Sequence, residues 1–270
     1  MYEKHPELII PEDETILWRY MDFTKFVSIL SKRELFFASP TLFNDQLEGS
    51  VTRLTLKNRV SNTRKFIDKI VGETNGDPVT EAIWDAITEK SSKETSKSIQ
   101  ANKRTLFFSC WHMNSYESAA MWDLYLASKG AGIAIRTSLE SFKLSFSDTR
   151  ERIWMGAIQY YDQHTDEIST PDALTPFFYK RKSYGHEQEL RAVTRMLDEN
   201  GKAIKPSTES NIGTLPRGIY IKTKLETLIE EIYVAPTAPD WFFEMVESVL
   251  KVYRLDKKVM RSSLDDAPMY

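Results

Sequence analysis

Short apolar segments bounded by turn residues recur along this chain, and helical segments separate them without a regular order. Strands are predicted at residues 16–20, 35–39, 106–111, 132–136, 153–161, 218–222, 231–235 and 258–262. A helix capped by Asp22 is predicted after the first strand, and others near 114–129, 176–183 and 237–250. Because strands and helices do not alternate one for one, the pattern favours an α+β fold: a mixed, mostly antiparallel sheet with flanking helices.

Residues 50–104 differ from the rest of the chain in composition. They are rich in Lys, Glu, Ser and Thr, with helical stretches at 61–71 and 79–90. The tract 91–103 has almost no apolar residues, so an exposed helix end or a mobile loop is expected there. We interpret 50–104 as a helical insertion that lies over a single domain of residues 1–270, and as a candidate lid.

Composition excludes several classes of protein. Cys110 is the single cysteine, so an intramolecular disulfide and a cysteine-rich zinc site are both excluded. The 36 basic and 39 acidic residues give a net charge of -3, which provides no global electrostatic reason to bind nucleic acid or membranes, although a local basic groove stays open. No apolar run reaches about 18 residues and none resembles a signal peptide, so a cytoplasmic location without a membrane partner is expected.

The segment 186–191 holds the most informative polar residues. If it is a strand, then Glu187, Glu189 and Arg191 share one face, because side chains alternate along a strand. Two carboxylates and an arginine beside apolar residues predict an acid/base site or a site that stabilises a cation. The alternative is a salt-bridged edge strand in which Arg191 neutralises both acids.

Arg19 lies inside an apolar strand and therefore needs a partner, because an unpaired buried guanidinium is costly. Its planar fork suits a phosphate or carboxylate of a ligand. A structural ion pair with Glu48 or Glu189 is the alternative.

Two further clusters have both a functional and a structural interpretation. Asn44 and Asp45, with Glu48 nearby, offer oxygen atoms to a metal or a ribose, and Asx-turn chemistry explains them equally well. Cys110 stands near His112, but a free cysteine in a hydrophobic strand is expected to be inert core rather than a nucleophile. The four histidines lack metal-binding spacing, and no phosphate-binding loop, GxGxxG or GxSxG motif is present.

Several motifs in one order resemble a bacterial family of uncharacterised proteins, domain-of-unknown-function family 2971. The motifs are Leu17-Trp18-Arg19-Tyr20, Leu35-Phe36-Phe37-Ala38-Ser39-Pro40, Phe43-Asn44-Asp45, Glu48-Gly49, Phe108-Ser109-Cys110-Trp111, Ala120-Met121-Trp122 with Tyr125, Gly132-Ile133-Ala134-Ile135, Tyr179-Lys180-Arg181 and Glu187-Gln188-Glu189-Leu190-Arg191. Many relatives have His in place of Arg19 and Pro in place of Gln46. This resemblance implies an architecture more than an activity.

A second resemblance is to ADP-ribosyltransferases, through an arginine in a first strand, a serine in a middle strand and Glu-x-Glu at a later strand. It implies that Arg19 holds the phosphate of NAD, that Ser109 shapes the nicotinamide-ribose pocket, and that Glu189 contacts the ribose. It also implies that Glu187 activates the acceptor. Tyr20 or Trp111 would then stack on the nicotinamide.

These observations predict an NAD-consuming, ADP-ribosyltransferase-like enzyme, a toxin or phage-defence effector that modifies an unknown macromolecular acceptor. The departing nicotinamide leaves an oxocarbenium-like ribose, which a fixed carboxylate stabilises. Two alternatives stay open. One is a magnesium-dependent nuclease that uses Asp45, Glu187 and Glu189 with Lys180 or Lys182 nearby. The other is a non-catalytic interaction domain.

Overall fold

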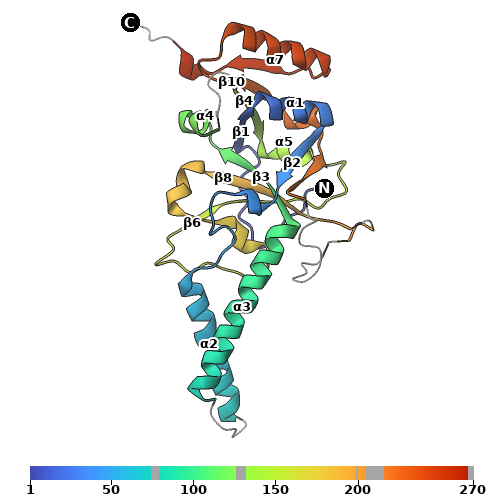
Figure 1. Cartoon of the computed structure of the whole chain (residues 1–270). Helices are drawn as coiled ribbons and strands as arrows, with labels where there is room; N and C mark the ends of the chain where they lie inside the picture. The colour runs from blue at the N-terminus through green and yellow to red at the C-terminus, as the bar shows by residue number, and fades with distance from the viewer. Residues whose placement is uncertain (74–78, 126–131, 199, 203, 205–215, 267–270) are drawn as a thin grey trace.

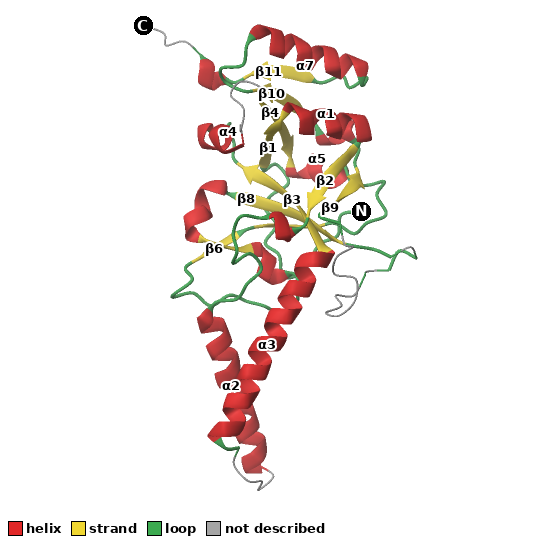
Figure 2. Cartoon of the chain, in the orientation of Figure 1, coloured by secondary structure: helices red, strands yellow, loops and turns green. Residues whose placement is uncertain are grey.

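A computed structural model of the chain shows one mixed sheet with helices beside it and a long helical hairpin at one end (Figures 1 and 2). The structure describes residues 1–73, 79–125, 132–198, 200–202, 204 and 216–266. The strands of the sheet are β1 (Ile16–Asp22), β2 (Glu34–Ala38), β3 (Leu106–Met113), β4 (Gly132–Ser138), β5 (Trp154–Ala157), β8 (Glu189–Arg195), β9 (Gly218–Lys222), β10 (Glu231–Val234) and β11 (Lys258–Arg261).

The strand order is β11-β10-β4-β1-β3-β2-β9, with β8 paired to β3 and β5 paired to β8. Every pair in this sheet is antiparallel except β10 with β11. A separate parallel pair consists of β6 (Gln159–Tyr161) and β7 (Tyr179–Arg181). The predicted α+β class with a mixed, mostly antiparallel sheet is therefore confirmed.

The central strand β3 has three partners, and their positions create a gap in the sheet. One edge of β3 pairs with β8 from Leu106 to His112, so β1 and β2 share the other edge. On that edge β1 pairs only near His112 and Met113, and β2 pairs at Phe108. The stretch 109–111 of β3 consequently has no strand partner on this edge within the described residues.

A short helix explains why β1 and β2 come together at this edge. Helix α1 (Phe23–Lys32) connects them, and the Asp22 side chain caps it by accepting a hydrogen bond from the Lys25 amide at 2.9 Å, as predicted. Arg33 ends the helix in the left-handed conformation, at φ 55°. Phe26 and Leu30 are buried against the sheet, which fixes the helix and both strands that it joins.

The last third of the chain covers the far end of the sheet. Helix α7 (Asp240–Val252) connects β10 to β11 and buries Phe242, Val246 and Leu250, in agreement with the helix predicted near 237–250. The short helices α5 (Leu139–Leu144) and α6 (Leu225–Leu228) add further buried apolar residues. The buried residues of this end belong to the larger of two apolar clusters, which also includes residues of β1 and β4.

Residues 53–105 form two long helices that extend away from the sheet (Figure 1). They are α2 (Arg53–Glu73) and α3 (Glu81–Thr105). The tract 91–103 is the mostly exposed C-terminal half of α3, so of the two expected alternatives the helix end is confirmed and the mobile loop is wrong. Its Lys, Glu, Gln and Ala residues have good helix propensity, so the helix continues through the tract. The lid interpretation required the hairpin to lie over the domain, but the hairpin extends away from the sheet (Figure 1).

Other local predictions were wrong for identifiable reasons. The predicted helix 176–183 is a 3-10 turn (Thr175–Phe178) followed by β7 and a second 3-10 turn (Lys182–Glu187), because Pro176 and aromatic residues favour turn and strand over helix. The predicted strand 153–161 is two strands, interrupted at Ile158. Helix α4 (Ala119–Tyr125) begins later than residue 114, where the predicted helix begins. The predicted end near residue 129 lies outside the described residues. None of the described helices is both long and apolar enough to span a bilayer.

Candidate functional site

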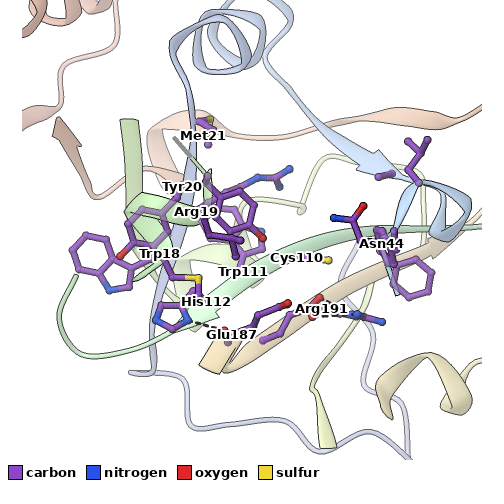
Figure 3. A pocket seen from close by; sticks show the side chains of 18 of the residues that line it. Trp18, Arg19, Tyr20, Met21, Asn44, Cys110, Trp111, His112, Glu187 and Arg191 are labelled. Atoms are coloured by element: carbon purple, nitrogen blue, oxygen red, sulfur yellow. Dashed lines mark hydrogen bonds and ion pairs between the residues drawn. The ribbon is translucent and has the colours of Figure 1, made fainter. Parts of the chain in front are cut away.

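A cavity of about 900 Å³ opens where β1, β2 and β8 meet β3. Its lining includes Arg19, Asn44, Glu187, Glu189 and Arg191, so residues far apart in the sequence converge on one space. Figure 3 shows Arg19 on one side of the strand that carries Cys110, and Glu187 and Arg191 on the other. This volume is within the range of cavities that bind small molecules and cofactors.

Arg19 occupies the gap between β1 and β2. Its Nη1 donates to Ser109 Oγ on β3, and its Nη2 donates to the Phe36 carbonyl oxygen on β2 at 3.3 Å. Its guanidinium also lies 5.5 Å from the centre of the Trp111 ring. Arg19 belongs to β1 and contacts β2 and β3, so this one residue connects all three strands that border the gap.

Arg19 has no carboxylate partner among the residues that the structure describes. The alternative ion pairs with Glu48 and Glu189 are not formed, because both acids bind Arg191 instead. Burial lowers the pKa of the Arg19 guanidinium, although an arginine in a protein stays charged. Two of its five N–H groups bind neutral oxygens, so the remaining charge and donors are available to an anion.

Glu189 is held on both carboxylate oxygens. Arg191 Nε donates to its Oε1 at 2.6 Å, and Lys180 Nζ lies 3.1 Å from its Oε2. Burial alone raises the pKa of Glu189, but the neighbouring Arg191 and Lys180 outweigh burial and hold that pKa at about 2. Glu189 is therefore an ionised, paired acid with only 3% of its surface exposed.

Arg191 completes this buried cluster rather than neutralising Glu187. Its Nη1 donates to Glu48 Oε1 and to the Phe177 carbonyl oxygen, the latter at 2.6 Å. The second oxygen of Glu48 is buried without a hydrogen-bond partner within the described chain. Strand β8 is also not an edge strand, because β3 and β5 flank it.

Glu187 reaches the cavity from a different backbone position than predicted. It ends a 3-10 turn, and Gln188 follows in the left-handed conformation at φ 37°, so strand alternation begins only at Glu189. Lys180 Nζ donates to Glu187 Oε2 at 2.6 Å, and Oε1 accepts no hydrogen bond from the described residues. Burial raises the pKa of Glu187, against the lowering effect of Lys180. Glu187 is thus the more available of the two acids, with 16% of its side chain exposed.

His112 fixes the backbone of Glu187. Its Nδ1 lies 2.6 Å from the Glu187 carbonyl oxygen, which can only accept, so Nδ1 carries the proton. Burial lowers the pKa of His112, and the ring is neutral near pH 7. Its Nε2 is therefore an acceptor, and it is buried without a partner among the described residues.

The other predicted site residues have mainly structural contacts. Asp45 is buried and accepts from Arg181 at 2.7 Å and from the Leu47 amide at 3.0 Å, which is the Asx-turn interpretation, whereas Asn44 is exposed at the cavity. Tyr20 and Trp111 line the cavity wall but are only 5% and 2% exposed. Neither therefore offers a free ring for stacking, because the apolar core already covers both rings.

Ser109 lies behind the cavity wall, whereas Cys110 is half-buried and lines the cavity. Ser109 is fully buried and accepts hydrogen bonds from Arg19 and from Trp111 Nε1, the latter at 3.0 Å, so it orients the arginine instead of shaping a ligand pocket. Burial raises the pKa of the Cys110 thiol, and the nearby Glu189 carboxylate raises that pKa further. A protonated thiol is a poor nucleophile, which agrees with the inert role predicted for Cys110.

Two residues of the site have no clear signal in the sequence. The nuclease hypothesis assigns Lys180 only an accessory role, yet in the structure it links Glu187 to Glu189. The signal that could have identified it is its place in an alternating Tyr-Lys-Arg strand beside large apolar residues. His112 lacks metal-binding spacing to the other histidines, and its bond to the backbone carbonyl of Glu187 has no sequence signature.

The acids do not form a metal site. Among the described residues, no group of three or more His, Cys, Asp or Glu side chains is arranged to hold a metal ion. Asp45, Glu187 and Glu189 each already bind a basic side chain. This arrangement does not favour the magnesium-dependent nuclease.

Comparison with known proteins adds no assignment, because no protein-family model matches the chain and no curated protein sequence matches it significantly. The resemblances to family 2971 and to ADP-ribosyltransferases therefore stay predictions.

Proposed function

We propose that this protein cleaves NAD and transfers its ADP-ribose to an acceptor, in the manner of an ADP-ribosyltransferase. One observation carries the proposal: Arg19, which has no carboxylate partner within the described residues, and the partly available Glu187 face the same cavity of about 900 Å³. A dinucleotide needs both features, a cation for its diphosphate and a carboxylate for the ribose that becomes cationic.

In the proposed reaction the bond between ribose C1′ and the nicotinamide nitrogen breaks, and its electron pair leaves with nicotinamide. Arg19 binds the diphosphate with the donors that Ser109 and Phe36 leave free. The Glu187 carboxylate stabilises the cationic ribose, and it accepts the proton of the acceptor as the acceptor bonds to C1′. Water in place of the acceptor would yield free ADP-ribose.

The proposal changes the roles that the resemblance implied for the two acids. Glu189 is fully engaged by Arg191 and Lys180, so it positions those cations and does not contact ribose. His112 holds the backbone of Glu187 in place and is a positioning residue. The rival interpretation is a non-catalytic domain in which the acids only close an ion-pair network, and it predicts no turnover of NAD.

The first test is release of nicotinamide from NAD, followed by chromatography. We expect Arg19→Met to weaken NAD binding by roughly tenfold to a hundredfold, the range of a lost charged hydrogen bond. We expect Glu187→Gln to retain binding and to lower turnover by about 10² to 10⁴. The matched controls are Arg150→Met and Glu244→Gln, both at exposed positions, and they should behave as the wild type.

Two results would contradict the proposal. One is equal NAD binding by Arg19→Met and Arg150→Met. The other is the absence of any nicotinamide release from the wild-type protein with cell extract as the source of acceptor. Cleavage of RNA or DNA with magnesium, lost in Glu187→Gln, would support the nuclease instead.

A further inference from the structure

The described part of the α2–α3 hairpin contributes few buried residues, among them Trp84 and Ala101, and none that line the cavity. It extends away from the sheet in both cartoon views (Figures 1 and 2). Among the described residues, none from 53 to 105 belongs to either of the two buried apolar clusters or lines the cavity. A segment of this length that stabilises little of the domain suggests a contact outside the molecule.

The hairpin is basic, whereas the rest of the chain is acidic. Residues 53–105 hold 11 Lys and Arg and 7 Asp and Glu, a net charge of +4. The remaining residues hold 25 Lys and Arg and 32 Asp and Glu, a net charge of -7. The near-neutral net charge of the chain is therefore the sum of a basic hairpin and an acidic remainder. The basic hairpin is the segment that extends away from the sheet.

A row of lysines runs along α3. Lys90, Lys93 and Lys97 are spaced by three and four residues, so they share one face of the helix, and all three are exposed. Lys93 Nζ lies 2.6 Å from Glu89 Oε1, but both side chains are about 70% exposed. Such surface ion pairs are weak, so Lys93 can exchange Glu89 for another anionic partner. Most of the neighbouring residues are Ser or Thr, which also bond phosphate oxygens.

We infer that the α2–α3 hairpin is a nucleic-acid-binding arm, whose Lys90, Lys93 and Lys97 contact the phosphate backbone. Exposed Lys57 and Lys65 on α2 add positive charge to the same arm. A membrane surface is less suitable, because an interfacial helix needs a continuous apolar face and this tract of α3 is polar on most sides. The polyanion that fits a narrow polar rod with a row of lysines is nucleic acid.

The root of the arm is bonded to Ser39, in a segment whose residues Ala38 and Leu42 line the cavity. Ser39 Oγ donates to the Lys103 carbonyl oxygen at 2.9 Å, close to the loop that carries Asn44. A strand bound along α3 would therefore lead toward the cavity. The arm does not depend on the proposed NAD chemistry, and if both are correct, nucleic acid becomes the acceptor to test first.

The experiment measures binding of the full chain to short fluorescent RNA and DNA, single- and double-stranded, by anisotropy. The test variant is Lys90→Gln/Lys93→Gln/Lys97→Gln. The matched control, Lys182→Gln/Lys251→Gln/Lys258→Gln, removes the same charge from exposed positions outside the hairpin. We expect at least one probe to bind the wild type, and the test variant to bind roughly tenfold more weakly or worse. The slope of log affinity against log salt should fall by about 2 to 3, because each lost contact removes about 0.7 to 0.9.

Other outcomes separate this inference from the proposed function. Arg19→Met should bind nucleic acid normally, and the lysine variant should release nicotinamide normally with water as acceptor. The inference is overturned if no probe binds, if both triple variants lose affinity equally, or if only vesicles of anionic lipid bind the arm. Circular dichroism of each variant shows that the helices are retained.

Discussion

At the scale of single residues, Glu189 and Glu187 have different roles: Glu189 is a buried, paired carboxylate, and Glu187 is partly exposed. Glu189 lies between Arg191 and Lys180, and its loss leaves a buried guanidinium without one of its two carboxylates. We therefore expect Glu189→Gln to lower the free energy of unfolding by about 3 to 5 kcal/mol, the usual effect of breaking a buried pair. Urea denaturation measures it. Glu187→Gln is the comparison, and its loss should be clearly smaller because Glu187 is partly exposed.

The same residue gives a prediction about pH. The pKa of Glu189 in the folded protein is about 2, below its ordinary value, so its stabilising effect is complete above that ordinary value. The effect is lost as pH falls through the interval between the ordinary pKa of glutamate and about 2. The stability difference between wild type and Glu189→Gln should thus be largest near pH 7 and narrow below about pH 4.3. A difference that stays constant from pH 7 to pH 3 would show that Glu189 is not held as an anion.

At the scale of elements, the positions of strands are easier to predict than the residues at which the strands begin and end. Apolar runs such as Leu106-Phe107-Phe108 identified β3, and Asp22 identified the start of α1, because both signals are local. The start of β8 and the end of the 3-10 turn before it are not predictable, since Gln188 adopts a left-handed conformation that is uncommon for residues other than glycine. The full lengths of α2 and α3 are also hard to predict, because long helices with few apolar residues have weak hydrophobic periodicity.

The same limit applies to the site. The sequence predicted that Arg19 needs a partner and that the acids near Glu187 are functional or paired. It could not show that β1 and β2 pair with different parts of β3. This arrangement is the reason that Arg19 contacts Ser109 and, within the described residues, no carboxylate. Pairing of strands that are far apart in the sequence decides this, and no local pattern records it.

The hairpin offers a prediction at the same scale, through Trp84. This side chain is 3% exposed, and Arg64 of α2 lies 5.6 Å from the centre of its ring, so it holds the two helices together. Trp84→Ala should remove about 3 to 5 kcal/mol of local stability. Hydrogen exchange should then speed up in α2 and α3, with the sheet unchanged. Ile83→Ala, at a neighbouring exposed position, is the control, and faster exchange in β3 would mean that the arm and the sheet unfold together.

At the scale of the whole molecule, the gap between β1 and β2 is the feature on which ligand binding should act. Each of these strands pairs with β3 over only one or two residues, so their junction with β3 depends on Arg19, which bonds to β2 and β3 from β1. A ligand that binds Arg19 and Glu187 together would connect β1 to the start of β8 across β3. Such a ligand stabilises the folded chain by about 2.7 kcal/mol at a hundredfold excess over its dissociation constant.

We therefore expect NAD to raise the thermal midpoint and to slow hydrogen exchange in β1, β2 and the start of β8, while α2, α3 and α7 exchange as before. The distribution follows from the position of the cavity, because none of the described residues of those three helices lines it. Arg19→Met should lose the protection in all three strands at once, whereas Arg150→Met should keep it. Protection confined to the hairpin, or spread evenly over the chain, would show that NAD does not bind across the gap in the sheet.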